Sequence, residues 1–421
     1  MDHFNWRKLE LHCEDVRLAD VAASVGTPAY VYSRRTIVEH YRRLQQAFAW
    51  ANPLICYSVK ACDNRAVLKV FVELGAGFDV VSGGEIHRVL KAGGDPGRIV
   101  FAGVGKTDDE IALAVDLDIH LFTVESEPEL EAIETVAARK GKHVRAALRV
   151  NPDVDPETHT YVTTGTRENK FGVDLQSAAA VLKRRGDFPH VDFVGVHAHI
   201  GSQITSVDPY VAALARVARF IRAQEAAGLK VDTIDIGGGF GIFYKLGEAL
   251  TAKEFSSAIR PVVAPLGKKV VMEPGRFIVG NAGVLLTRVI FVKESGDKRF
   301  VIVDAAMNDL IRPALYGAEH RVWPVKPPFL PGDASRMPGL KRADIVGPVC
   351  ESGDFLALDR PFPDVRRGDL VAVFSAGAYG MTMSSNYNSR PRAPEVLVEG
   401  DAFRVVRRRE TYDDLMRYES C

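Results

Sequence analysis

The sequence predicts an α/β protein with two domains, a (β/α)8 TIM-type barrel followed by a β-rich domain. Between about residues 54 and 275, eight short apolar runs alternate with longer amphipathic stretches. A barrel of this type takes about 250 residues, which suits the region. After about residue 282, strand-like runs follow one another without long helices between them. The total length of 421 residues also exceeds what one hydrophobic core usually serves.

The eight apolar runs are continuous, as expected of strands in a parallel sheet that helices cover on both faces. They occupy residues 54–60, 78–82, 98–103, 120–124, 145–150, 193–200, 233–238 and 269–274. Between them, residues 208–228 show a helical pattern, with apolar residues three and four apart. This helix is expected to begin at Asp208-Pro209 and to stop at Gly228, because proline suits the first turn and glycine the end.

The β-rich domain is expected to contain strands at residues 283–295, 299–305, 370–376 and 393–400. Proline and glycine cluster in residues 325–339, which predicts a loop. We expect the first 30 residues, which are too few to fold alone, to pack onto this domain. The predicted division is therefore a barrel of residues 31–281 and a β-domain of residues 1–30 and 282–421.

Composition and charge exclude several classes of protein. Apolar residues make up 47% and charged residues 26% of the chain, as in globular proteins. Lys plus Arg and Asp plus Glu both total 54, so the net charge favours neither nucleic acid nor an anionic membrane as a partner. No apolar run approaches the roughly 20 residues that cross a bilayer, and the charged N-terminus is unlike a secretion signal. The five scattered cysteines form no CxxC pair, so we expect reduced thiols and a cytoplasmic location.

Polar residues collect at the predicted carboxyl ends of the strands, where the active sites of (β/α)8 barrels lie. Lys60 closes the first apolar run, and a lysine is costly to bury there without a purpose. Taken alone, it could equally be a surface lysine whose stem lies along apolar surface. The other strand-end positions are Asp79, Arg149, His199, Gly237, Gly238, Gly239 and the run Glu273, Pro274, Gly275, Arg276.

The glycine run suits a phosphate, because backbone N–H groups can approach an anion closely there. It does not match the dinucleotide fingerprint, since Ile242 stands where the third glycine would be. A lysine on the first strand and a phosphate site on the seventh predict pyridoxal phosphate held as a Schiff base. Glu273 would keep the pyridine nitrogen protonated, or else form a structural ion pair with Arg276. His199 would stack on the ring, whereas His197 is expected to be a hydrogen-bonded residue of the barrel interior.

Seven motifs together resemble the diaminopimelate decarboxylase family, pyridoxal-phosphate enzymes of the alanine racemase-like fold (fold type III). They are YSVKA, HIGSQ, DIGGGFG, EPGR, MNDLIRPALYG, GPVCESGD and GAYG, and the similarity, which includes TGTRENKFGVD, runs from MDHF to PEVLVEG. The resemblance implies the same two-domain fold. It also implies a carboxy-lyase that converts meso-2,6-diaminopimelate to L-lysine and CO2, the last step of lysine biosynthesis.

The resemblance implies roles for the matched residues. Lys60 would form the Schiff base and His199 would stack on the cofactor ring. With the strand-end residues, the cofactor-binding set would be Lys60, Asp79, Arg149, His199, Ser202, Gly237, Gly238, Gly239, Glu273, Pro274, Gly275, Arg276 and Tyr379, where Tyr379 reaches the phosphate. The substrate would meet Arg276, Arg312, Tyr316, Glu351 and Tyr379. Cys350 would lie beside the reacting carbon as a catalytic residue, with Lys60, His199 and Glu273.

In the resembling family, Cys350 and Glu351 enter the site from the neighbouring subunit, so a homodimer with shared active sites is expected. Either Cys350 or Lys60 would donate the proton after CO2 leaves. Two positions depart from the family pattern, Met307 and Glu319, and both concern fine contacts with the substrate.

The far end of the substrate separates this family from sister decarboxylases of another basic amino acid or a carboxylated polyamine. A lone cationic amine calls for an acidic residue without opposing arginines. Diaminopimelate also carries a carboxylate there, which Arg276, Arg312 and Tyr316 would bind. Arg312 and Tyr316 could instead be ordinary surface residues, and Pro313 between them argues against a continuous helix face.

Two further alternatives remain open. His197-Ala-His199 has the HxH spacing of a zinc site, which would suit a metal-dependent barrel hydrolase. That interpretation needs more His or Asp ligands at strand ends, where the chain offers mainly Lys, Arg and Gly, so we expect no metal. A catalytically silent, cofactor-binding regulator of the same fold is disfavoured because Lys60, Cys350 and Glu351 are all present.

Overall fold

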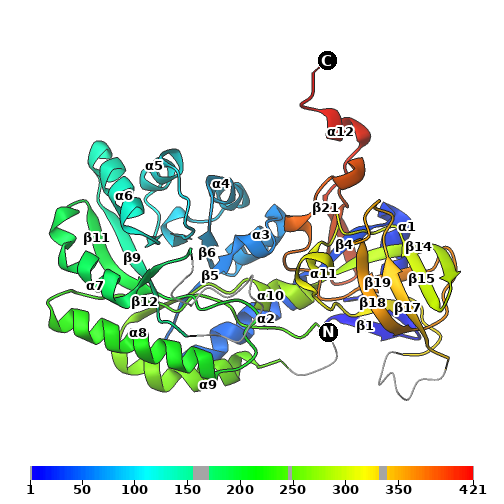
Figure 1. Ribbon diagram of the computed structural model, residues 1–421, viewed down its shortest axis with the longest axis horizontal. Helices are drawn as coiled ribbons and strands as arrows, with labels where there is room; N and C mark the ends of the chain where they lie inside the picture. Colours follow the sequence, from blue (N-terminus) through cyan, green and yellow to red (C-terminus); the bar gives the residue numbers. More distant parts are fainter. Residues whose placement is uncertain (1, 155–169, 245–248, 331–338, 421) are drawn as a thin grey trace. The chain divides into compact units, whose positions relative to one another are not determined.

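The fold is taken from a computed structural model that describes residues 2–154, 170–244, 249–330 and 339–420 (Figure 1). The chain forms two compact units. The barrel unit comprises His40–Ile242 and Ala249–Phe277, and the β-domain comprises Met1–Glu39, Phe243–Glu248 and Ile278–Cys421. Part of the TGTRENKFGVD motif, residues 164–169, lies outside the described residues.

The barrel unit contains a closed ring of eight parallel strands, so the predicted (β/α)8 barrel with a separate β-rich sheet is confirmed. Neighbouring strands pair in order around the ring, and β13 pairs with β5 to close it. The strands are β5 (Leu54–Ser58), β6 (Gly77–Val80), β7 (Ile99–Phe101), β8 (Leu121–Val124), β9 (Val144–Asn151), β11 (Val191–His197), β12 (Thr233–Asp235) and β13 (Lys269–Met272). A short strand, β10 (Val173–Asp174), adds to the outside edge of β9.

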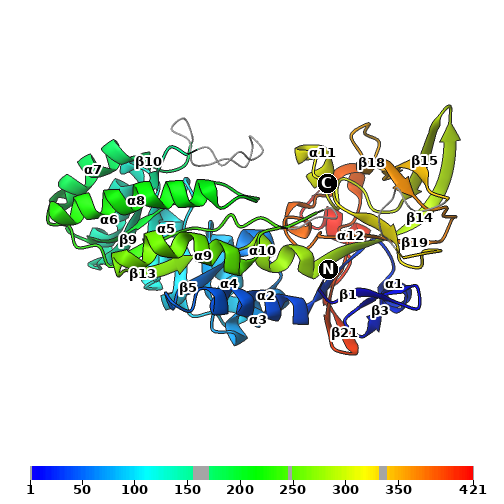
Figure 2. The ribbon, with the colours of Figure 1, turned by 90° about the horizontal axis from the view of Figure 1, so that it is seen from below.

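Helices alternate with the strands along the chain, beginning with α2, which precedes β5. They are α2 (Arg34–Ala47), α3 (Arg65–Glu73), α4 (Gly83–Ala92), α5 (Asp108–Asp116), α6 (Glu127–Lys140), α7 (Leu175–Lys183), α8 (Asp208–Ala226), α9 (Ala252–Val263) and α10 (Arg276–Val279). The longest of them, α8, begins at Asp208 with proline in its first turn, as predicted. Figure 2 shows α8 and α9 side by side along the strands. Inside the ring, side chains from several strands form one dry cluster: Cys56, Val100, Leu121, Ala147 and Val271.

Several strands end earlier than the apolar runs do. The chain leaves β5 at Ser58 and forms a 3-10 turn, Val59–Ala61, which carries Lys60. Similarly, β11 ends at His197 and β12 at Asp235, so His199 and the glycine run lie on the loops that follow. The functional candidates therefore stand just beyond the strand ends, where the loops of such a barrel enclose its site.

The β-domain is built around one sheet with the order β18-β17-β15-β14-β4-β20-β21. Its strands are β4 (Ala29–Ser33), β14 (Gly283–Ser295), β15 (Lys298–Val303), β17 (Lys341–Val346), β18 (Phe355–Phe362), β20 (Glu395–Glu399) and β21 (Ala402–Arg407). Two more strands, β16 (Val322–Pro324) and β19 (Leu370–Val373), pair with each other, and β19 also pairs with β14. Strand β4 thus joins segments from opposite ends of the chain.

The N-terminal residues belong to the β-domain. They form a small sheet of β1 (Phe4–Arg7), β2 (Glu10–Cys13) and β3 (Val16–Arg17), followed by α1 (Leu18–Val25). Their apolar side chains share a core with the later strands, since Phe4, Leu11 and Val21 are buried in one cluster with Leu286 and Val398. Of the predicted loop 325–339, residues 331–338 lie outside the described residues.

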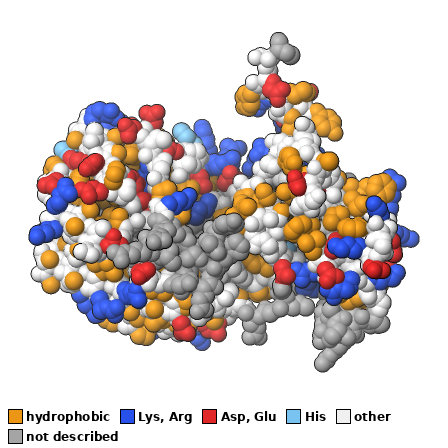
Figure 3. Space-filling model, viewed as in Figure 1, with side chains coloured by type: hydrophobic (Ala, Val, Ile, Leu, Met, Phe, Trp, Pro, Cys, Tyr) orange, Lys and Arg blue, Asp and Glu red, His pale blue; other side chains and the backbone are white. Residues whose placement is uncertain are grey.

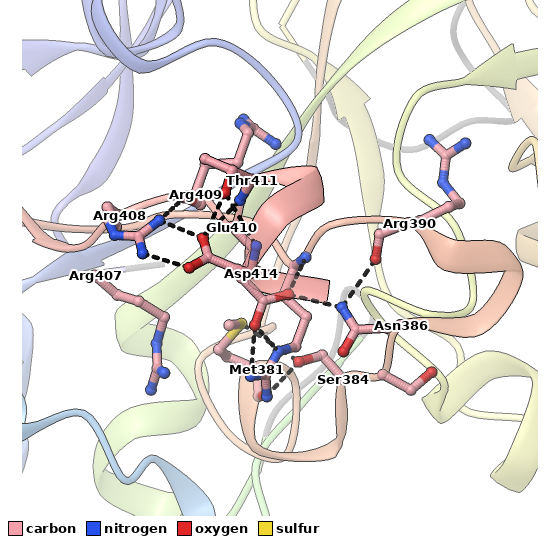
Figure 4. Close-up of polar contacts among 12 residues, drawn as sticks. Met381, Ser384, Asn386, Arg390, Arg407, Arg408, Arg409, Glu410, Thr411 and Asp414 are labelled. Carbon is pink, nitrogen blue, oxygen red and sulfur yellow. Dashed lines mark hydrogen bonds and ion pairs between the residues drawn. The ribbon is translucent and has the colours of Figure 1, made fainter. Parts of the chain in front are cut away.

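Polar contacts hold the C-terminal segment of the β-domain, which ends in the short helix α12 (Tyr412–Met416). Glu410 accepts hydrogen bonds from Asn386 Nδ2 at 2.7 Å and from Arg392 Nε at 2.7 Å. Arg408 pairs with Asp414, whose backbone N–H is capped by the Thr411 hydroxyl (Figure 4).

Acidic and basic side chains are interspersed over the visible surface, in keeping with the zero net charge (Figure 3). Among the described residues, no helix is long and apolar enough to span a membrane.

Candidate active site

Lys60 and Asp79 form the centre of the polar group at the strand ends of the barrel. Lys60 Nζ donates to Oδ2 of Asp79 over 2.7 Å, and Asp79 lies on β6, the strand next to β5. The lysine side chain is 37% exposed, whereas the Asp79 side chain is fully buried. The lysine side chain is therefore reachable from solvent, which a lysine needs in order to react with an aldehyde.

The Ser58 hydroxyl connects this pair to the end of a third strand. It lies 2.7 Å from Asp79 Oδ2 and 2.9 Å from the carbonyl oxygen of Glu273. Burial raises the pKa of Asp79, and the charge of Lys60 opposes that effect. The three residues fix the relative positions of the ends of β5, β6 and β13.

Glu85 is a second carboxyl that feels the charge of the lysine, and no motif in the sequence distinguishes it. It lies in the first turn of α4, where Oε2 accepts a hydrogen bond from the N–H of Val81 at 2.8 Å. Burial raises the pKa of Glu85 to about 7, although the charge of Lys60 acts to lower it. An acid in the first helical turn is common, so only the fold distinguishes this one.

Glu273 stands directly after β13, and its side chain is 4% exposed. Burial disfavours its ionised form, but the charges of His197 and Lys60 outweigh burial and hold the pKa of Glu273 below its usual range. His197 Nε2 lies 3.2 Å from Oε2. The other oxygen, Oε1, is buried and has no hydrogen-bond partner in the part of the chain that the structure describes.

A buried carboxylate that stays ionised suits the protonated pyridine nitrogen of pyridoxal phosphate. The partly exposed Lys60 suits the aldehyde of the same molecule. The described residues therefore fit this cofactor.

Asp235, the last residue of β12, extends the buried group on the other side of Glu273. Its Oδ1 accepts from the N–H of Gly237 at 2.8 Å. Burial and the Glu273 charge raise the pKa of Asp235 well above its usual value. One polar atom each of His197, Asp235 and Glu273 lies within 4.8 Å of the others. His199 is outside this group, so the HxH pair does not converge in the described structure.

His199 is held on the loop after β11 by the glycine run. Its Nδ1 accepts a hydrogen bond from the N–H of Gly238 at 3.2 Å, which requires that nitrogen to carry no proton. Burial, together with the charge of Arg149, lowers the pKa of His199 well below its usual value. The ring is therefore neutral, as a ring that stacks on a cofactor can be.

Arg149, expected among the cofactor-binding residues, is paired inside the barrel. Its Nη1 lies 2.8 Å from Oε1 of Glu125, and both side chains are buried. The guanidinium also packs over the Phe171 ring at 4.7 Å. Arg149 acts on the site through its charge, which lowers the pKa of His199.

The glycine run allows the backbone to pass close to neighbouring loops. Gly237 and Gly239 have φ values of 65° and 92°, which favour glycine. A Cβ at Gly238 would lie 2.1 Å from the carbonyl oxygen of Glu273, and one at Gly239 would lie 2.1 Å from that of Gly201. Glycine is therefore required by packing as well as by conformation.

The expectation that the run turns its amides toward an anion does not hold for Gly237 and Gly238. Their N–H groups already donate to Asp235 and His199. A phosphate contact from this run would therefore come from Gly239 or beyond.

The EPGR segment packs against the turn that carries the lysine. A Cβ at Gly275 would lie 2.9 Å from the Cβ of Ser58 and 3.0 Å from that of Ala61. Arg276, the first residue of α10, is buried and donates through Nη2 to the Ser202 hydroxyl at 2.9 Å. The sequence motif is thus explained by close approach at its glycine and by a hydrogen bond at its arginine.

Arg312 belongs to the β-domain, where it begins the short helix α11 (Arg312–Tyr316). The prediction that Pro313 prevents a helix between Arg312 and Tyr316 was wrong. Proline stands in the first turn, where its missing N–H has no intrahelical partner to lose. Arg312 is 5% exposed, and its guanidinium lies over the rings of Tyr244 at 5.0 Å and Tyr316 at 5.6 Å.

Cys350 and Glu351 follow β17 on an exposed turn of the β-domain. The N–H of Cys350 donates to Asn388 Oδ1 at 2.7 Å. Asp354 organises this turn, because its two carboxylate oxygens accept from the N–H groups of Val349 and Met307, each at 2.7 Å. Sequence reasoning missed Asp354, since its partners are far apart in the chain.

Tyr379 lies on another loop of the β-domain, between glycines of the GAYG motif. Its φ of 55° is unusual for a residue with a side chain. A Cβ at Gly377 would lie 2.0 Å from the carbonyl oxygen of Val279, so this loop is also fixed by close backbone packing. The predicted site residues thus divide between the two units. The barrel unit contains Asp79, Arg149, His199 and the glycine and EPGR runs, and the β-domain contains Arg312, Tyr316, Cys350, Glu351 and Tyr379.

The chain is similar to known proteins along its whole length. A family described as "Pyridoxal-dependent decarboxylase, pyridoxal binding domain" matches residues 34–280. A diaminopimelate decarboxylase of Pseudomonas aeruginosa is 49% identical over 420 residues, covering 100% of this chain and 99% of the relative. One of Aquifex aeolicus is 46% identical, covering 98% and 96%. The crystal structure of diaminopimelate decarboxylase from Helicobacter pylori complexed with L-lysine superposes with a TM-score of 0.90 at 39% identity, covering 96% and 99%.

Proposed function

This chain belongs to the diaminopimelate decarboxylase family, and we propose how its own residues carry out the reaction. The enzyme is a pyridoxal-phosphate-dependent carboxy-lyase of lysine biosynthesis (EC 4.1.1.20) that converts meso-2,6-diaminopimelate to L-lysine and CO2. When bound, the cofactor supplies an aldehyde for amines and a ring that withdraws the electrons left behind by CO2. The remaining tasks fall to side chains.

Lys60 would hold the cofactor covalently through its Nζ, by way of the aldehyde that the cofactor supplies. Asp79 balances the charge of the Lys60 amine, because its buried carboxylate lies 2.7 Å from Nζ. The ionised carboxylate of Glu273 would keep the cofactor nitrogen protonated. His199 would provide a neutral ring for stacking, and Gly239, Ser202 and Tyr379 would bind the phosphate end.

Substrate choice rests on arginine. Arg312 and Arg276 are buried guanidinium groups at 5% and 7% exposure, and a guanidinium shielded from water forms strong, bidentate hydrogen bonds with a carboxylate. Together with Tyr316 they bind the carboxylate at the non-reacting end of diaminopimelate by charge-assisted hydrogen bonds. Lysine, ornithine and arginine carry no carboxylate at that end. The buried Arg312 is the observation that carries this specificity.

Cys350 and Glu351 act on the substrate of the neighbouring subunit in a homodimer. Both are exposed on the single chain. In this proposal, Cys350 lies beside the reacting carbon and Glu351 beside the distal amine. A partner subunit would bury them. Cys350 or Lys60 then returns a proton to the carbon that lost CO2.

Specificity is tested with the purified holoenzyme and four substrates in separate reactions: meso-diaminopimelate, L-lysine, L-ornithine and L-arginine. Released CO2 is measured in each. We expect CO2 from diaminopimelate and at least about a hundredfold less from the others, which lack the distal carboxylate. Release from lysine or ornithine at a rate equal to that from diaminopimelate would refute the arginine-based specificity.

A further inference from the structure

The guanidinium of Arg312 is surrounded by three ring side chains of the β-domain. Besides the rings of Tyr244 and Tyr316, His320 lies next to it, and Arg312 Nε donates to His320 Nε2 at 3.3 Å. His320 is 3% exposed and also contacts the Tyr244 ring edge-on, with centroids 5.0 Å apart. His320 stands four residues beyond Tyr316 in the same motif region, and no sequence pattern marks it as functional.

The two hydrogen bonds of His320 determine its protonation state. Its Nδ1 lies 2.9 Å from the carbonyl oxygen of Phe374, which can only accept, so Nδ1 carries a hydrogen. Its Nε2 faces the Nε–H of Arg312, which can only donate, so Nε2 carries a lone pair. His320 is therefore a neutral imidazole in the Nδ1–H form, and an imidazolium could not accept the second bond.

This arrangement links the arginine to a rigid part of the sheet. Phe374 directly follows β19, and His320 precedes β16, which pairs with β19 through Val322 and Val373. The N–H of Phe374 also donates to the carbonyl oxygen of Arg321 at 2.8 Å. One end of the imidazole is thus fixed by paired backbone, and the other end fixes the direction of the Arg312 side chain.

We infer that His320 is a positioning residue that aims the Arg312 guanidinium at the distal carboxylate of the substrate, through the Nδ1–H tautomer. The inference rests on the proposed role of Arg312. Because Arg312 Nε is bound to His320, the guanidinium is held in one orientation before substrate arrives, which lowers the entropic cost of binding. His320 itself need not touch the substrate.

Two conservative variants separate this role from a structural one. Glutamine places an amide oxygen near the position of Nε2, so H320Q keeps an acceptor for Arg312. Asparagine places an amide nitrogen near the position of Nδ1, so H320N keeps only the bond to Phe374. For the holoenzyme we expect H320N to raise the KM for diaminopimelate about tenfold, with kcat changed less than about threefold. H320Q should stay within about threefold of wild type in both constants.

The opposite ranking, with H320N close to wild type and H320Q impaired, would mean that His320 serves only to anchor the strands, and the inference would fail. Equal KM values in both variants and wild type would also overturn it. H87N is the control, since His87 is an exposed residue of α4, and it should match wild type.

R312A separates failure of this inference from failure of the proposed function. If R312A raises KM and H320N does not, Arg312 binds substrate without help from His320. If R312A leaves KM unchanged, the proposed carboxylate role is itself wrong. An independent readout is the 15N spectrum of histidine-labelled enzyme, assigned with H320Q, in which the His320 signals should show a protonated Nδ1 and an unprotonated Nε2. A protonated Nε2 would contradict the inference.

Discussion

Lys60 and Asp79 form an ion pair across adjacent strands of the barrel, with Nζ and Oδ2 2.7 Å apart. The lysine is partly open and the aspartate fully buried, so the carboxylate can stay in place while the amine reacts. A buried carboxylate without a partner is costly. The pair therefore explains both how the amine is oriented and why the aspartate is tolerated in the strand.

K60A should abolish both activity and covalent capture of the cofactor. Borohydride reduction of wild-type enzyme soaked with pyridoxal phosphate should leave the adduct on the peptide containing Lys60, as read by mass spectrometry. The same treatment of K60A should leave none there. K69A removes an exposed lysine of α3 and should keep the adduct. A wild-type adduct on another lysine would contradict the assignment.

E273Q should bind cofactor but turn over slowly. Glutamine is neutral and cannot stabilise a protonated pyridine nitrogen, so we expect kcat to fall by about a hundredfold or more. The borohydride adduct on Lys60 should persist, which separates chemistry from cofactor binding. E131Q, at an exposed position of α6, is the control and should leave kcat unchanged. A kcat near wild type in E273Q would remove Glu273 from the mechanism.

R312A should weaken substrate binding without affecting the cofactor. Loss of a charge-assisted contact to the distal carboxylate should raise the KM for diaminopimelate at least about tenfold. The absorbance of the bound cofactor should be unchanged, since Arg312 has no proposed role there. Steady-state kinetics and an absorption spectrum of the same preparation check both halves. A changed spectrum with an unchanged KM would mean that Arg312 acts on the cofactor and not on the substrate.

Mixing two inactive variants should restore activity if the active site is shared between subunits. The K60A and C350A chains are unfolded together and refolded at equal amounts. Half of the dimers should then be heterodimers, and each heterodimer should have one intact site of its two. The expected recovery is about a quarter of the wild-type rate, on the assumption of random pairing. Sedimentation confirms dimers in the mixture. No recovery, with dimers formed, would show that Lys60 and Cys350 act within one chain.

Asp309 should make the stability of the β-domain depend on pH. Its side chain is buried, and burial raises the pKa of Asp309 to about 7, whereas an unfolded aspartate titrates near 4. Protonated Asp309 therefore contributes to the free energy of unfolding. This contribution is complete below about pH 4 and is lost as pH rises to about 7, because only the unfolded chain releases the proton in that interval.

D309N keeps an acceptor for the N–H of Ala306 and removes this titration. Between pH 4 and 8, the free energy of unfolding should fall more in wild type than in D309N, by at most about 4 kcal/mol. Urea unfolding of both proteins at several pH values measures this difference in the free energy of unfolding. D401N, at an exposed turn, is the matched control and should follow wild type.

The sequence allowed the barrel to be predicted because parallel strands buried on both faces are continuous apolar runs. All eight runs became strands, but the strands end before Lys60, His199 and the glycines. Apolar character does not reveal where backbone pairing stops. Similarly, an isolated proline does not show whether it stands within or before a helix, which is why the helix at Arg312 was missed.

The site residues that were missed are polar groups whose partners are distant in sequence. Glu85 acquires its raised pKa from burial near Lys60, and Asp354 bonds to Met307 across 47 residues. The role of His320 depends on its hydrogen bonds with Arg312 and with the carbonyl oxygen of Phe374. Lys60 and Glu273 could be found because each interrupts an apolar run, a signal that these other residues lack.

Strand β4 pairs with β14 on one side and with β20 on the other, and this has a consequence for synthesis on the ribosome. The nascent chain exposes residues 29–33 early but produces their second neighbour, residues 395–399, only near the end. The barrel strands emerge in between and find all their partners first. Translation that stops before residue 395 would leave β4 with an open edge, ready to pair with another chain and aggregate.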